Sequence, residues 1–246
     1  MRPIPLALLV AAIVFYLVTL VRARRRTRKL AGQIRSLRSL AANSHVYRPP
    51  TASERIPESD LPLFSSASAE LGSAGFTVLA DLMGVPAGRE PSGITRWFAA
   101  PDGRVVGWFG VARSARVPPG VPIFALLSRA PDGLYLATVR GAPGVRPAPP
   151  PFVRRTDVPG TRPFAELLAA HDAAIAASGV PRARLEVRTT ADGAVSLYGE
   201  QHASISAWRA SQPPAALLDA DLREILGARH DELAPALRSL LLADRP

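Results

Sequence analysis

Cysteine is absent from the 246-residue sequence, which excludes disulfide bonds, thiolate nucleophiles and thiolate metal ligands. Asparagine occurs once, at Asn43, and the residues that follow it do not complete an N-glycosylation sequon. Lysine also occurs once, at Lys29, so arginine carries nearly all of the positive charge. We interpret this bias as that of a GC-rich bacterial genome. The sequence therefore gives no support to a disulfide framework or to an extracellular glycoprotein.

Acidic residues are missing from residues 1–48, and this segment holds ten basic residues. The rest of the chain has twenty basic and twenty acidic residues and is formally neutral. The net charge of +10 and the pI of about 11.2 therefore describe one end of the sequence. A neutral domain has no general attraction to phosphate, so we predict no nucleic-acid partner.

Charge of either sign is missing from residues 3–21, an apolar run long enough for one helix to cross a bilayer. We therefore predict a single transmembrane helix there. A cleaved signal peptide and a buried helix of a globular domain are the alternatives. Positive charge is retained on the cytoplasmic side, so the predicted location is the bacterial inner membrane, with the N-terminus outside and residues 22–246 in the cytoplasm.

Basic residues follow the apolar run at once, and apolar residues then recur at helical spacing, which predicts a basic amphipathic stalk over residues 22–42. The basic side chains either fix membrane topology or bind anionic lipid head groups, and the apolar stripe either packs on the domain or pairs two stalks. The predicted membrane-surface residues are Arg22, Arg24, Arg25, Arg26, Arg28 and Lys29.

Prolines divide the remaining sequence. Residues 43–62 have the composition of a linker, and residues 63–246 are predicted to form one cytoplasmic α+β domain. Residues 141–160 are predicted to be an extended Pro-rich loop, either a linker or a docking segment.

The tetrapeptide Ala-Pro-Asp-Gly occurs at residues 100–103 and again at 130–133, each time between runs rich in aromatic and β-branched residues. Pro, Asp and Gly are turn residues, so both copies are predicted to be hairpin tips. With the run at residues 75–86, the flanking segments predict a mostly antiparallel, five-stranded meander sheet. Trp97 and Trp108 would lie on adjacent strands as a packing pair.

Both faces of this sheet are apolar, so each needs cover. We expect cover from within the chain; a bound apolar ligand and a membrane surface are the alternatives. Helices are predicted over residues 63–71 and 163–178, and two more at the C-terminal end, over 214–226 and 231–242. Residues 194–209 fit either a strand or a helix, and we favour a helix.

The sequence contains few motifs for catalysis, cofactor binding or metal binding. No phosphate-binding loop, nucleophile elbow, zinc-binding helix motif or complete dinucleotide fingerprint occurs. Asp219, Asp221 and Glu224 resemble the start of a calcium loop but lack its glycine and its final glutamate, so we predict no metal site and no cofactor.

His171 is the one weak catalytic candidate, because it lies on a predicted apolar stripe with Glu166 and Asp172 nearby. Burial would lower its pKa and poise it for acid–base chemistry. A hydrogen-bonded core histidine is the structural alternative.

The leading functional hypothesis is a non-catalytic, membrane-tethered binding or scaffold module for a protein or an apolar ligand. A membrane-attached enzyme that uses His171 as acid or base, and a lipid-binding domain with an apolar cavity, are the alternatives.

Overall fold

The computed structural model describes residues 21–22, 24–32, 34, 45–86, 93–114, 117–141, 147–160 and 162–243. They form two compact units, each described here by itself. Unit 1 comprises the described parts of residues 1–42, 145–148 and 212–246, and unit 2 comprises those of 43–144 and 149–211.

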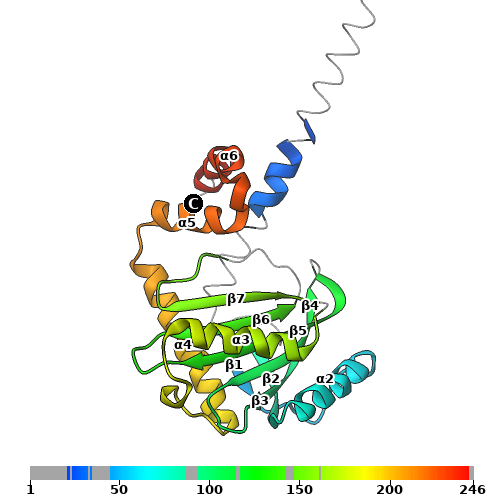
Figure 1. The fold of residues 1–246 in the computed structure, drawn as a ribbon. Coiled ribbons are helices and arrows are strands. Elements are labelled where there is room, and N and C mark those ends of the chain that lie inside the picture. The colour runs from blue at the N-terminus through cyan, green and yellow to red at the C-terminus, as the bar shows by residue number, and fades with distance from the viewer. Residues whose placement is uncertain are drawn as a thin grey trace, which may run out of the picture. The chain divides into compact units, whose positions relative to one another are not determined.

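Unit 2 is an α+β fold built on one sheet of seven strands, which lie in the same order in space as in the chain (Figure 1). The strands are β1 (His45–Arg48), β2 (Thr77–Pro86), β3 (Gly93–Ala99), β4 (Val106–Ser114), β5 (Val117–Arg129), β6 (Tyr135–Gly141) and β7 (Val153–Pro159). All neighbouring strands are antiparallel except β6 and β7, which are parallel.

The helices of unit 2 are α2 (Leu61–Ser73), α3 (Phe164–Ser178) and α4 (Ala191–Ser211), with short 3-10 turns at Glu58–Asp60 and Arg182–Arg184. Helix α2 has a proline in its first turn, where no backbone N–H is needed. Helix α3 ends at Gly179, whose φ of 76° is the left-handed conformation that glycine adopts without strain. The helices predicted at 63–71, 163–178 and 194–209 are confirmed, and the first two carry these local signals.

The two faces of the sheet have different cores, and each is covered from within the chain. One face packs on α2 and α3 through a cluster that includes the contacting rings of Phe64, Phe109 and Phe124, with centroids 4.6–4.8 Å apart between successive rings. The other face packs on α4 around Trp97, whose ring meets Tyr198 edge-on at 5.1 Å. Figure 1 shows α3 and α4 on opposite sides of the sheet.

The prediction of five strands is wrong, because the sheet has seven strands and is mixed, with β7 parallel to β6 and the other pairs antiparallel. Strands β2–β6 do form an antiparallel meander, and Trp97 and Trp108 are register partners in it. The two further strands lie inside the Pro-rich segments 43–62 and 141–160. Proline is tolerated in an edge strand, so a Pro-rich segment can still contain a short strand. Pairing with the meander stabilises β1 and β7, and their composition does not reveal them.

The prediction of a single-pass membrane protein is also overturned. Across the described residues, no helix is long and apolar enough to cross a bilayer. The described helices instead alternate buried and exposed positions, so their apolar residues form stripes rather than continuous runs. Of the predicted span at 3–21, residues 3–20 lie outside the described residues, and Val21 is helical and exposed.

Unit 1 is helical. It contains residues 21–34, which are helical wherever they are described and are here called helix 21–34, and the confirmed C-terminal helices α5 (Pro214–Leu226) and α6 (His230–Ala243), separated by a 3-10 turn at Gly227–Arg229. Its core contains Ala31, Ile34, Leu218, Leu222, Ala234, Leu237 and Leu241.

Candidate functional site

The two Ala-Pro-Asp-Gly segments are hairpin turns with the same hydrogen bonds, which confirms their prediction. In the first, the Gly103 N–H donates to the carbonyl of Ala100 at 2.8 Å, and the Arg104 N–H donates to the Asp102 carboxylate at 3.0 Å. Residues 130–134 repeat both bonds, at 3.0 and 3.2 Å. Because β3–β4 and β5–β6 are successive hairpins of one meander, both tips lie at the same end of the sheet.

An extended segment at residues 185–190, here called the strap, is bonded to both turns. The Glu186 N–H donates to the carbonyl of Arg129 at 2.9 Å, and the Arg188 N–H donates to the carbonyl of Gly103 at 2.7 Å. Gly103 has a φ of 65°, and a Cβ there would approach the side chains of Val187 and Thr189 within 3 Å. The strap therefore closes over the turns at a position that only glycine accommodates.

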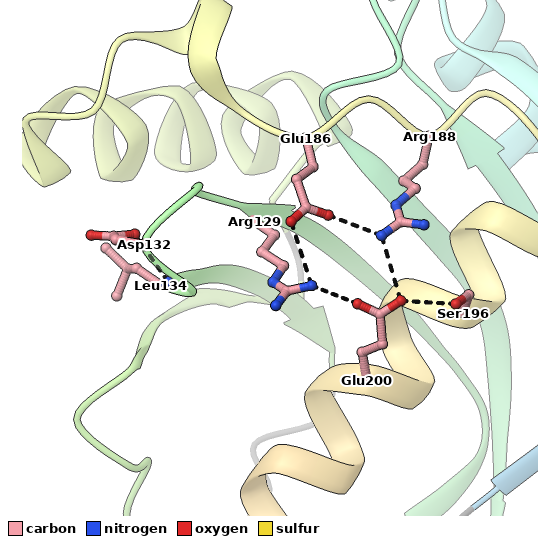
Figure 2. A network of polar contacts seen from close by, with 7 residues as sticks. All are labelled: Arg129, Asp132, Leu134, Glu186, Arg188, Ser196 and Glu200. Atoms are coloured by element: carbon pink, nitrogen blue, oxygen red, sulfur yellow. Dashed lines mark hydrogen bonds and ion pairs between the residues drawn. The ribbon is translucent and has the colours of Figure 1, made fainter.

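Four charged side chains form a closed ring where the strap meets α4 (Figure 2). Arg129 pairs with Glu200 at 2.6 Å and with Glu186 at 3.4 Å, while Arg188 pairs with Glu186 at 2.9 Å and with Glu200 at 3.4 Å. The Ser196 hydroxyl adds a hydrogen bond to Glu200 at 2.9 Å. Two positive and two negative groups balance, and each is about two-thirds shielded from solvent. The ring therefore connects the strap to β5 and α4 through ion pairs, and its charges balance without a ligand.

Replacing Glu200 with Gln is expected to lower the free energy of unfolding by about 1–2 kcal/mol, because two arginines would then share one carboxylate. Urea denaturation at low and high salt measures the change, and the loss should shrink as salt screens the arginines. Glu166→Gln is the matched control, since Glu166 belongs to an exposed pair with Arg162, and should cost under about 0.5 kcal/mol. Equal losses in the two variants would contradict a cooperative ring.

His171 lies on the buried face of α3 and is fully shielded from solvent. Its two ring nitrogens meet hydroxyl groups on the sheet: Nε2 lies 3.0 Å from Ser128 Oγ on β5, and Nδ1 lies 2.9 Å from Thr138 Oγ1 on β6. The single proton of Ser128 is donated to the carbonyl of Arg104 at 2.8 Å, so Ser128 accepts from His171. The imidazole is therefore the Nε2–H tautomer, and Thr138 donates to Nδ1.

Burial, and after it the positive charge of Arg182, lowers the pKa of His171 from 6.5 to about 4. The two carboxylates predicted to assist it have other partners: Asp172 pairs with Arg182 at 2.6 Å, and Glu166 pairs with Arg162 at 3.3 Å. The imidazole is thus neutral at physiological pH with both nitrogens bonded inside the protein. This geometry fits the structural alternative, and the catalytic role of His171 stays a prediction.

The predicted membrane-surface residues all lie on helix 21–34 of unit 1 and are all exposed: Arg22, Arg24, Arg25, Arg26, Arg28 and Lys29. Asp219, from the rejected calcium-loop pattern, pairs with Arg223 at 3.0 Å and also with Arg238. Asp221 is buried and accepts the Ala148 N–H at 3.0 Å. Among the described residues, no group of three or more His, Asp or Glu side chains is arranged to hold a metal ion.

Sequence reasoning does not identify Ser128, Thr138 or the members of the ring. The available signal for the first two is a hydroxyl residue that follows an apolar run within a strand, which in a buried sheet requires a hydrogen-bonding partner. The partner of each, His171, is more than thirty residues away along the chain. Comparison of the chain with protein-family models, curated proteins and solved structures finds no match in any of the three.

Proposed function

We propose that this chain is a non-catalytic binding module. The observation that carries the proposal is that both ring nitrogens of His171 are hydrogen-bonded within the protein. His171 is the residue that the sequence places best for acid–base chemistry. Its Nε2–H donates to Ser128 and its Nδ1 accepts from Thr138, inside a core that excludes solvent. A general acid or base must reach a substrate proton within about 3 Å, and both nitrogens here are already bonded to the sheet.

The charged side chains of unit 2 add to this support. Arg129, Arg188 and their two carboxylates balance one another's charge in the ring. Arg96 and Asp81 form a bidentate pair across β2 and β3, at 2.7 and 2.8 Å. These groups are engaged in holding elements together, so a binding role at the surface is the function that the described geometry supports best.

The lipid-binding alternative receives no such support. It requires an apolar cavity between the sheet and its helices, whereas aromatic rings in mutual contact occupy that space. Phe164 of α3 lies 5.4 Å from Phe76 and 5.5 Å from Phe124, with the rings measured between centroids. Rings at these separations are in van der Waals contact.

Metabolite profiling tests the proposal against the enzyme alternative. The purified full chain is incubated with a cell metabolite extract, in parallel with His171→Gln, and the extracts are compared by mass spectrometry. We expect no compound to be consumed by the wild type and spared by the variant. A compound with that behaviour would establish catalysis and overturn the proposal. Thr138→Val, which removes the hydroxyl bonded to Nδ1, serves as the second variant if His171→Gln does not fold.

A further inference from the structure

Four cations form one continuous face of helix 21–34, here called the basic face: Arg22, Arg25, Arg26 and Lys29. Their spacing of three, four and seven residues places them along one side of a helix over roughly 10 Å. All four are exposed, and Arg24 and Arg28 add exposed charge on other sides of the helix. The helix thus presents a dense row of positive charge to its surroundings.

The opposite side of the helix is occupied. Ala31 and Ile34 are buried in the core of unit 1 with Leu218, Leu222 and Leu237 of α5 and α6. The helix is therefore held in its folded state by packing, and a partner of the basic face would not have to order it.

Nearby carboxylates do not neutralise the basic face. In unit 1, Asp219 pairs with Arg223 and Arg238, Glu232 pairs with Arg229 at 3.3 Å, and Asp221 is buried. Within the described part of the chain, none of the six cations of helix 21–34 forms an ion pair. Like charges three and four residues apart repel one another, so an external anion would relieve this repulsion.

The form of the surface favours one class of anion. A helix that binds at a lipid surface exposes a broad apolar face beside its basic side chains, whereas here Ala31 and Ile34 are buried and Val21 is the only large apolar side chain exposed among the described residues of the helix. Nucleic acid is contacted over many phosphates, whereas residues 49–246 are formally neutral and add no net positive charge to the basic face. Arginine, which dominates the face, matches the planar carboxylate group with paired hydrogen bonds.

We propose that the basic face docks an acidic segment of a partner protein, with the carboxylates of Asp and Glu paired to Arg22, Arg25, Arg26 and Lys29. This inference rests on the proposed function, because it names the partner chemistry of a binding module. The contact is electrostatic, so it is fast to form and sensitive to salt.

The test compares two double variants of the full chain that change the net charge equally. Arg25→Glu with Lys29→Glu reverses the centre of the basic face, while Arg55→Glu with Arg184→Glu reverses two exposed arginines of unit 2. Far-UV circular dichroism confirms folding. Fluorescence anisotropy then measures binding of a labelled oligoglutamate peptide over a salt series, with phosphatidylserine vesicles and a DNA duplex as competing probes.

We expect the basic-face variant to weaken oligoglutamate binding by about tenfold or more, and the control to change it less than about twofold. Equal weakening by both variants would overturn the proposal, because net charge alone would explain it. Binding of vesicles or duplex that depends on the basic face, without such binding of oligoglutamate, would also overturn it. His171→Gln should bind oligoglutamate like the wild type, so failure here is distinguishable from a catalytic role found by metabolite profiling.

Discussion

Replacing Gly107 with Ala is expected to destabilise unit 2 by about 3 kcal/mol or more, or to prevent folding. Gly107 lies in β4, where it pairs with Phe98 of β3 and Leu126 of β5. A Cβ at this position would lie against the carbonyl oxygen of Ala125 and 2.6–2.8 Å from the Phe98 ring. The carbonyl belongs to the neighbouring strand, and Phe98 is fully buried among other aromatic rings. Neither group has space into which it can move.

Gly199→Ala provides a control of opposite sign. Gly199 lies within α4, and a Cβ there would meet no atom within 4 Å. Alanine favours a helix over glycine, so this variant should gain up to about 1 kcal/mol. Urea denaturation of both variants measures the changes. A Gly107→Ala protein as stable as the wild type would show that the strands around β4 are more loosely packed than described here.

Lowering the pH from about 6.5 to 4 is expected to remove about 3 kcal/mol of stability through His171 alone. Its pKa is about 4 in the folded protein, compared with 6.5 for the free side chain, because burial opposes the charged form. The unfolded chain therefore takes up a proton in this range while the folded protein does not, and proton uptake favours unfolding. The stabilisation is fully present above pH 6.5 and is lost as the pH falls.

The slope of stability against pH identifies the residue. In His171→Gln, no imidazole titrates at this position, so the free energy of unfolding should fall less steeply between pH 6.5 and 4 than in the wild type. The other three histidines are present in both proteins, and their contributions cancel in the comparison. Nitrogen chemical shifts of the wild-type imidazole should report the Nε2–H tautomer. Identical slopes would contradict burial of a neutral His171.

Elements with local signals were predictable from sequence. The turns at residues 100–103 and 130–133 contain the residue types that their backbone angles and side-chain bonds require, and Gly179 marks the end of α3 in the same way. Strands β1 and β7 have no such signal, because their stability comes from pairing with β2 and β6 while their composition is that of a loop. Apolar composition at residues 3–21 likewise predicted a spanning helix that the described structure does not support.

The sequence predicted the position of His171 on its own helix but not the residues that contact it from other elements. The helical spacing of Leu167, His171 and Ile175 predicted a histidine on an apolar stripe, and all three are buried. Its partners come from β5 and β6, and the ring joins β5, the strap and α4. Such contacts depend on tertiary packing, which residue spacing along one element does not encode.

Residues 145–148, between β6 and β7, belong to unit 1, and Ala148 donates its N–H to the buried Asp221 there. Neither unit is therefore continuous in the sequence. A gene fragment that ends at residue 144 omits a strand and two helices of unit 2, and one that ends at residue 211 keeps Ala148 but lacks Asp221, the acceptor of its N–H. No single boundary divides this polypeptide into the two units. Expression of unit 2 alone requires removal of residues 145–148, and expression of unit 1 alone requires that these residues be joined to its other two segments.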